Sequence, residues 1–311
     1  MDHAVAVTGL RKRYDRIAAL EAVDFTAAPG ALLGIIGADG AGKTTLLRIL
    51  ATLLTPDHGT ARTLDLDCVK DFARLRRLIG YMPQRFSLYE DLSVAENLSF
   101  FADVFDVRAG ERAARMRRLL SFSRLEPFRK RRAGRLSGGM KQKLALSCAL
   151  IHTPRLLLLD EPTTGVDPLS RREFWDILRE LRSQGITILV TTPYMDEAEY
   201  CDDLVLLHQG RLLVHGPPAD LIEDYPLSLF AVRSSENVVA LPRDARLPPT
   251  VHRAYPVAGA LHVAAEPGRA DRSAIADALK GYVPEDSVVE EVKPRAEDLF
   301  FYHLSPSDGG R

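Results

Sequence analysis

Residues 37–45, GADGAGKTT, decide which fold this chain can adopt. They match the pattern G-x-x-x-x-G-K-[ST], with an apolar run before them and a helical pattern after them. Glycines let several backbone N–H groups converge on phosphate oxygens, and the following helix adds the positive end of its dipole. We expect Lys43 to reach the β- and γ-phosphates of a nucleotide and Thr44 to offer its hydroxyl to Mg²⁺. The predicted nucleotide contacts are Gly37, Ala38, Asp39, Gly40, Ala41, Gly42, Lys43, Thr44 and Thr45.

A pair of carboxylates follows a later apolar run, LLLLDEP, at residues 156–162. Asp160 would end a buried strand near the Mg²⁺ shell, and Glu161 would orient or deprotonate an attacking water. An acidic pair at a strand end can also be a helix N-cap. Downstream of a phosphate loop, the catalytic interpretation is favoured.

Continuous apolar runs at residues 31–36, 78–83, 155–160 and 186–192 predict strands buried on both faces. Such strands form a parallel sheet covered by helices, so the fold class is α/β. An arginine-rich helical pattern occupies residues 92–135. The sequence pattern changes near a proline-rich stretch, LPRDARLPP, which indicates a domain boundary. We therefore predict a main domain at residues 1–222 and a small α/β domain at 223–311 that ends in a frayed tail.

The bulk composition is that of a globular protein, with 46% hydrophobic and 27% charged residues in 311. The net charge of -1 gives no support to a surface that coats nucleic acid. The three cysteines, Cys68, Cys148 and Cys201, are scattered, which argues against a disulfide framework and a zinc site and fits a reducing cytosol. We find no signal-peptide pattern at residues 1–15 and no apolar run of membrane-spanning length.

The order of these features resembles the ATP-binding subunits of ABC transporters. Residues 135–150, RLSGGMKQKLALSCAL, resemble the signature motif of that family, with Met140 where glutamine is common. The resemblance covers about residues 5–217 and implies a P-loop NTPase of ABC-cassette type, with a mixed, largely parallel sheet and a helical subdomain. It implies ATP contacts for the motif residues Ser137, Gly138, Gly139 and Met140.

The same resemblance implies roles for three further residues. Gln84 in YMPQ is similar to the Q-loop glutamine, which reaches Mg²⁺ and the attacking water and senses the membrane partner. Asp167 in TTGVDP is similar to the D-loop aspartate, which crosses a dimer interface. Tyr14 in RKRYD is similar to the aromatic residue that stacks on adenine, with an ordinary surface tyrosine as the alternative. The implied catalytic set is Glu161, Gln84, Lys43 and Asp160, and the implied Mg²⁺ ligands are Thr44, Gln84 and Asp160.

The family implies an assembly as well as a site. Two subunits, as a homodimer or a heterodimer, would sandwich two ATP molecules between one phosphate loop and the other signature motif. Separate ABC permease subunits would carry the membrane spans, and the helical segment at 92–135 would receive their coupling helix. Residues 80–104 and 193–212 resemble bacterial multidrug-type exporters of the daunorubicin-resistance kind. The expected location is cytoplasmic, on the inner face of the cell membrane.

Two alternatives stay open at this point. A soluble ABC-type ATPase acting on nucleic acid or the ribosome normally has two cassettes or long insertions, which this chain lacks, so no nucleic acid is expected as a partner. A regulatory cassette that binds ATP with little hydrolysis is the second alternative.

The arginine runs at 112–118 and 128–135 are interpreted as solvated helix faces, with an acidic partner or anionic lipid as the minor alternative.

Proline at position 193 raises that second alternative. Residues 188–200, ILVTTPYMDEAEY, run from a buried strand into an acidic helix start. The family normally has a histidine there that contacts the γ-phosphate, and Pro193 provides no side-chain donor. We expect Pro193 to lie in the first turn of a helix capped by Thr192, with Asp196 and Glu197 favouring the helix N-terminus. Thr192, or a water held by Gln84, would compensate in part for the lost contact.

Overall fold

The computed structural model describes residues 3–85, 88–235, 241 and 247–304. The predicted frayed tail at 305–311 and most of the proline-rich stretch lie outside them. By its internal contacts the chain divides into two compact units, Met1–Pro218 and Ala219–Arg311. Within the described residues, no helix is both long enough and apolar enough to cross a lipid bilayer.

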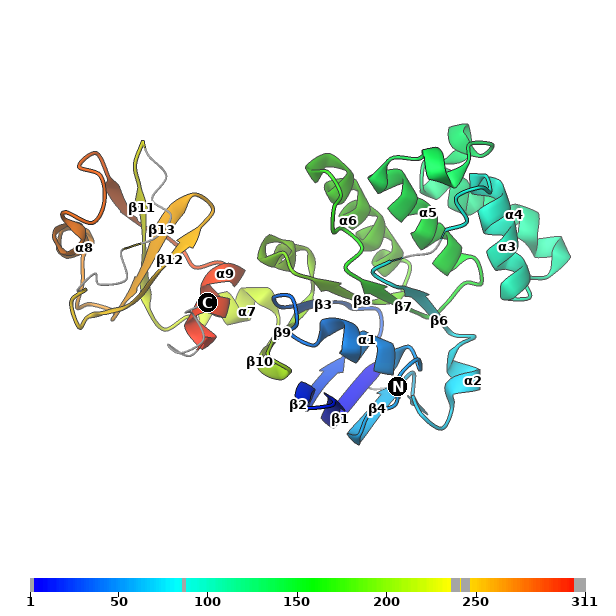
Figure 1. The fold of residues 1–311 in the computed structure, drawn as a ribbon, viewed down its shortest axis with the longest axis horizontal. Coiled ribbons are helices and arrows are strands. Elements are labelled where there is room, and N and C mark those ends of the chain that lie inside the picture. The colour runs from blue at the N-terminus through cyan, green and yellow to red at the C-terminus, as the bar shows by residue number, and fades with distance from the viewer. Residues whose placement is uncertain (1–2, 86–87, 236–240, 242–246, 305–311) are drawn as a thin grey trace. The chain divides into compact units, whose positions relative to one another are not determined.

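The core of the first unit is a six-stranded sheet in the order β10-β9-β3-β8-β7-β6 (Figure 1). Five of its strands run parallel, and β10 pairs antiparallel with β9. Every residue of the three central strands is buried, as the apolar runs predict. The α/β fold class is therefore confirmed. The strands are β3 (Leu32–Ile36), β6 (Ile79–Met82), β7 (Leu156–Asp160), β8 (Thr187–Thr192), β9 (Asp203–His208) and β10 (Arg211–Gly216).

A second, antiparallel sheet lies beyond α1 (Lys43–Leu50), which packs between the two sheets (Figure 1). Its order is β2-β1-β4-β5. Leucines of α1 join one apolar cluster with both sheets, so the helix that follows the phosphate loop is held from two sides. The strands are β1 (Val5–Tyr14), β2 (Ile17–Ala27), β4 (His58–Thr63) and β5 (Leu66–Asp67).

Helices cover the other face of the core sheet and continue into a helical subdomain. On this side α5 (Gly138–Leu150) packs on β6, and α6 (Pro168–Ser183) packs on β3 and β8. The subdomain adds α3 (Val94–Val104) and α4 (Ala109–Phe122). Ser93 starts α3 through a capping box with Glu96. The short α2 (Phe72–Leu75) precedes β6, and the helical interpretation of residues 92–135 is confirmed.

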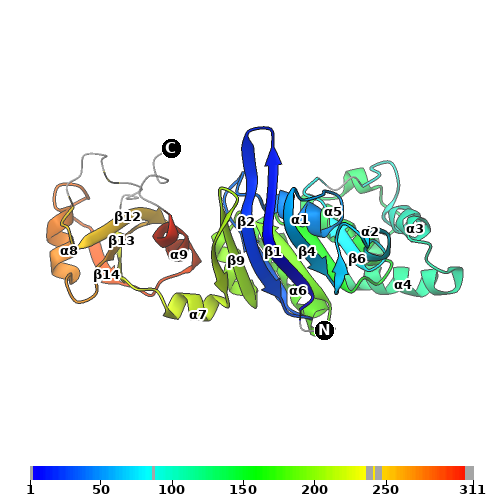
Figure 2. The same ribbon diagram turned by 90° about the horizontal axis from the view of Figure 1, so that it is seen from below.

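The second unit is a small sheet between two helices. Its order is β12-β13-β11-β14, with all pairs antiparallel. Helix α8 lies on one face of the sheet and α9 on the other (Figure 2). Apolar side chains of each helix join a cluster with the sheet residues of that face. The elements are α7 (Pro218–Glu223), β11 (Ser228–Arg233), β12 (Val251–Val257), β13 (Ala260–Ala265), α8 (Arg272–Leu279), β14 (Val288–Glu291) and α9 (Ala296–His303).

Candidate functional site

The phosphate loop joins β3 to α1, and its glycines are required by close backbone contacts. A Cβ on Gly37 would lie 2.3 Å from the Leu207 carbonyl oxygen, and one on Gly42 would lie 2.4 Å from that of Ala19. Gly42 also has φ 104° at the start of α1, a conformation that other residues adopt only with strain. The loop therefore curls tightly against β2 and β9 and leads into the N-terminus of α1, an end of a helix that favours bound anions.

Lys43 lies folded across this loop. Its ammonium donates to the carbonyl oxygens of Gly37 at 2.7 Å and Ala38 at 3.1 Å. It also pairs with Glu161 Oε1 at 3.1 Å, and both side chains are more than nine-tenths buried. A buried ion pair of this kind is held by Coulomb attraction in a low-dielectric setting. The ammonium is thus directed over the concave side of the loop.

Asp160 occupies the end of β7, beside the first turn of α1. Its Oδ1 accepts hydrogen bonds from Thr44 and Thr191, each at 2.9 Å. Burial raises the pKa of Asp160, while the two hydroxyl donors oppose that rise. The second carboxylate oxygen, Oδ2, is buried without a hydrogen-bond partner among the described residues. An unpartnered buried carboxylate oxygen next to a threonine hydroxyl fits the oxygen ligands that Mg²⁺ prefers.

Glu161 stands one residue further, held from several directions. Gln84 donates from Nε2 to Glu161 Oε2 at 2.9 Å, and the Thr164 hydroxyl contacts the same oxygen at 3.4 Å. The backbone N–H of Glu161 donates to the Thr191 hydroxyl at 2.9 Å. Its φ of 49° is left-handed, which is uncommon outside glycine and turns the carboxylate toward Lys43. The fold therefore brings Gln84, Lys43, Thr44, Asp160 and Glu161 together.

The segment after β8 differs from the expected capped helix. It is a 3-10 helix, Met195–Tyr200, whose N-cap is Tyr194, so Pro193 lies before the first turn and that expectation is wrong. The reason is that the Thr192 hydroxyl accepts the N–H of Tyr194 at 3.0 Å, which forms a tight turn around the proline. Glu197 is fully buried.

Two threonine hydroxyls donate to Glu197. They belong to Thr192, at the end of β8, and to Thr163, at 3.2 Å. The Thr192 hydroxyl therefore has both a donor and an acceptor partner inside the protein. Its proposed compensation for the missing histidine finds no support in this geometry.

The signature residues lie at the start of α5, away from the phosphate loop. Ser137 is the N-cap and accepts the N–H of Met140 at 3.4 Å. Ser137 and Gly138 are exposed, whereas Gly139 is buried. A Cβ on Gly139 would meet Ser170 of α6 at 2.5 Å, so only glycine lets the two helices approach this closely.

Asp167 lies on the neighbouring helix start. It caps α6 by accepting the N–H of Ser170 at 2.9 Å, and this backbone donor lowers the pKa of the Asp167 carboxyl. Because Gly139 packs against Ser170, the signature motif and the Asp167 turn lie side by side. Both present exposed residues to solvent.

Tyr14 ends β1 in the hairpin that supports the loop. Its side chain is 44% exposed, so a flat ring system has access to it. The same hairpin contributes Ala19, whose carbonyl oxygen lies against Gly42. The hairpin thus connects the predicted adenine contact to the phosphate loop.

Three residues of this site do not follow from the motifs. Thr191 links Asp160 to the backbone of Glu161, and Thr163 and Glu197 form a second buried pair nearby. The signal for Thr191 is its place in an apolar strand, because a buried hydroxyl needs a partner. Glu197 gives no such signal, because an acid in a first helical turn is normally exposed.

Comparison with known proteins agrees with these motifs. The ABC transporter family model matches residues 20–164. The chain is 46% identical over 251 residues to the "Probable multidrug ABC transporter ATP-binding protein YbhF" of Escherichia coli (strain K12). That match covers 79% of this chain and only 43% of the relative, so the chain spans less than half of its length.

Other relatives match over most of their length. The "Nod factor export ATP-binding protein I" of Ralstonia nicotianae (strain ATCC BAA-1114 / GMI1000) is 40% identical over 219 residues, which cover 70% of this chain and 68% of that protein.

Among solved structures, cbiO1 from Clostridium perfringens, described as part of the cbiONQ ABC transporter complex, superposes with a TM-score of 0.67 at 28% identity. The match covers 72% of this chain and 92% of cbiO1. The cassette MJ0796, described as dimeric and bound to ADP and Pi in a post-hydrolysis state, gives 0.63 at 27% identity and covers 68% and 98%. The chain belongs to the ATP-binding proteins of ABC transporters.

Proposed function

We propose that this chain binds and hydrolyses ATP as one subunit of an ABC exporter whose membrane spans lie in separate permease subunits. The observation that carries the proposal is the buried ion pair of Lys43 and Glu161, with Gln84 hydrogen-bonded to Glu161 and Thr44 hydrogen-bonded to Asp160. It combines a cation for phosphates, a fixed carboxylate for water and oxygen ligands for a divalent cation. The multidrug and Nod-factor export relatives support the export role.

Binding of ATP would exchange one set of Lys43 contacts for another. The ammonium would leave the carbonyl oxygens of Gly37 and Ala38 for oxygens of the β- and γ-phosphates. The N–H groups of the loop and the α1 N-terminus add donors to the same phosphates. Tyr14 would stack on the adenine ring.

The residues that would hold Mg²⁺ are Thr44, Asp160 and Gln84. When bound, the ion would offset negative charge on the β- and γ-phosphate oxygens. Asp160 offers Oδ2, which has no partner among the described residues, while its Oδ1 stays fixed by Thr191. One carboxylate oxygen of Asp160 would thus bind the ion, while the other keeps its hydrogen bond within the protein.

Glu161 would activate the attacking water. Gln84 and the Thr191 hydroxyl hold its side chain and backbone, so the carboxylate is oriented before the substrate binds. The water oxygen would attack the γ-phosphorus as its proton passes to Glu161. The bond to the bridging oxygen breaks, and ADP leaves with that electron pair, which yields ADP and phosphate.

A second ATP-binding subunit would complete the site. Ser137, Gly138 and Asp167 are exposed on adjoining helix starts, with a serine hydroxyl, backbone N–H groups and a helix N-terminus available for phosphate. We infer a head-to-tail dimer in which these groups close over the partner's ATP. The dimeric cassette MJ0796 is consistent with such a pairing.

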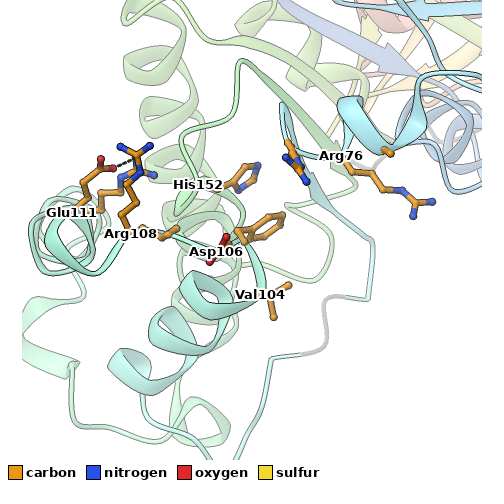
Figure 3. Close-up of a pocket in the computed structure, with 11 residues that line it drawn as sticks. Arg76, Val104, Asp106, Arg108, Glu111 and His152 are labelled. Carbon is orange, nitrogen blue, oxygen red and sulfur yellow. Dashed lines mark hydrogen bonds and ion pairs between the residues drawn. The ribbon is translucent and has the colours of Figure 1, made fainter.

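The permease would dock at the groove drawn in Figure 3. This groove of about 650 Å³ lies between the end of α2, the end of α3 and the start of α4. His152 stands between Arg76 on one side and Arg108 on the other (Figure 3). Four arginines and two carboxylates line it, so we propose that it receives an acidic permease segment, with this chain held on the cytoplasmic face of the membrane.

The test of the hydrolytic role is Glu161→Gln. We expect ATPase activity to fall by at least about 10²-fold, because the base that accepts the proton is lost. Binding of a fluorescent ATP analogue should persist, and the variant should form an ATP-dependent dimer on gel filtration. Glu199→Gln, the same change on an exposed side chain, is the matched control. Parental ATPase activity in Glu161→Gln would refute the assignment.

A further inference from the structure

The second unit contains a cavity of about 450 Å³ that has no part in the ATP site. It lies on the α9 face of the sheet, and its lining residues come from the end of β11, the β12–β13 turn, β13 and the segment that enters α9. His262 forms part of its wall from β13. Apolar residues of α8 pack against the opposite face of the sheet, so the cavity lies on one face of the sheet only.

His262 is presented to this cavity in a fixed orientation. Its Nδ1 lies 2.7 Å from Oδ1 of the fully buried Asp298, which also accepts the Tyr255 hydroxyl at 2.9 Å. Burial raises the pKa of Tyr255, so the phenol keeps its proton and donates. The backbone N–H of Arg295 satisfies Asp298 Oδ2 at 2.7 Å.

The other ring nitrogen of His262 is the one left for a ligand. The side chain is only 6% exposed, yet it lines the cavity. No hydrogen bond to Nε2 from the described residues is found, while Nδ1 is held by Asp298. A histidine oriented by a carboxylate on one nitrogen commonly uses the other for binding.

Basic residues line the cavity on the side of this histidine away from Asp298. Arg233, Lys293 and Arg295 line the cavity, and no carboxylate is among its lining residues in the part of the chain that the structure describes. Arg233 also pairs with Glu290 at 2.9 Å on the exposed side. Lys293 and Arg295 have exposed side chains. Such a set favours an anion over a metal cation.

The rest of the wall is apolar, formed by Val257, Ala258, Val292 and Pro294. We propose that this cavity binds a small organic anion, whose phosphate or carboxylate head accepts hydrogen bonds from Arg295, Lys293 and the Nε2–H of a His262 imidazolium, with a short apolar stem against the two valines. The volume exceeds that of a bare phosphate ion, and the apolar wall gives a stem favourable burial.

The experiment uses the full chain with isotope-labelled histidine and follows the ring resonance of His262 by NMR. The probes are butyl phosphate, inorganic phosphate and butanol. We expect a saturable shift with butyl phosphate, a weaker affinity for inorganic phosphate and no shift with butanol. Lys293→Glu with Arg295→Glu should raise the Kd for butyl phosphate by at least about tenfold, because two charge-assisted contacts are lost. Hydrolysis of ATP is not required for any of these results.

Arg272→Glu, the same charge reversal on α8, is the matched control and should leave the Kd unchanged. The absence of a saturable shift, or an unchanged Kd in the double variant, would overturn the proposal. If butanol shifted the His262 resonance as effectively as butyl phosphate, the requirement for an anionic head would be overturned. Inorganic phosphate as tight as butyl phosphate would overturn the apolar stem.

Discussion

Proline 193 bears most directly on how fast this site turns over. It follows β8, at the position where the resemblance to the family implies a γ-phosphate-contacting histidine, and it offers neither a side-chain donor nor an N–H. Thr192 cannot replace that donor without breaking contacts, because its hydroxyl already accepts from Tyr194 and donates to Glu197. We infer a site that binds ATP well and hydrolyses it slowly, which keeps a regulatory role open beside the transport role.

Pro193→His is therefore expected to raise the ATPase rate. One preorganised donor is worth about 10²–10³ in rate where nothing compensates, and we expect about 10–10² here, since neighbouring groups have adapted to proline. The measurement is steady-state phosphate release by the purified chain. Pro193→Ala is the matched control, since it restores an N–H but no side-chain donor, and it should stay near the parental rate. A histidine variant no faster than the alanine variant would mean that this site is built to work without the donor.

Single residues of the site differ in how far sequence predicts them. Lys43, Asp160 and Glu161 sit in contiguous motifs whose chemistry demands those residue types, so their meeting in space could be predicted. Glu197 could not, because its burial depends on Thr163 and Thr192, which come from separate strand ends. Tertiary packing, not local pattern, turns this acid inward.

The 3-10 helix Met195–Tyr200 acts as a clamp between neighbouring elements. Its Glu197 accepts from Thr192 at the end of β8 and from Thr163 in the turn after β7, and it lies 3.7 Å from Arg171 Nε on α6. Tyr200 stacks on Trp175 of α6 at 5.1 Å between ring centroids. The clamp therefore joins the strand end that carries Pro193 to the turn that leads to Asp167.

Glu197→Ala should destabilise the first unit by about 2–3 kcal/mol, because two buried hydroxyls lose their acceptor. Trp175 is the only tryptophan in the sequence and lies fully buried beside this clamp, so urea unfolding followed by its fluorescence reports on the right region. Glu199→Ala, an exposed acid on the same short helix, should change the free energy of unfolding by less than about 0.5 kcal/mol. Equal effects of the two substitutions would contradict the clamp.

Helices and strands were more predictable than their ends. The sequences of β3, β7 and β8 are continuous apolar runs, and the helices around them show helical spacing of apolar residues. The turn after Thr192 was not predicted, because a side-chain hydrogen bond to the Tyr194 N–H competes with helix capping there.

The first unit as a whole offers one surface whose charge matches its proposed partner. The groove between α2 and the helical subdomain has four arginines, and Glu111 among its carboxylates is already paired with Arg115. Arg76 is tied to Thr52, so its role is partly structural. Arg77 and Arg108 are exposed and line the same groove. These two are the residues whose charge a docking segment would meet.

Arg77→Glu combined with Arg108→Glu should therefore reduce the amount of permease recovered with this chain from native membranes by about tenfold or more, since like charges would face each other across the contact. The ATPase rate of the detached chain should not change, because neither residue belongs to the nucleotide site. Arg74→Glu is the matched control: it reverses the same charge on α2 but lies outside the groove. Undiminished recovery of the permease with the double variant would place the docking surface elsewhere, and recovery of ribosomes or nucleic acid in its place would contradict the export role itself.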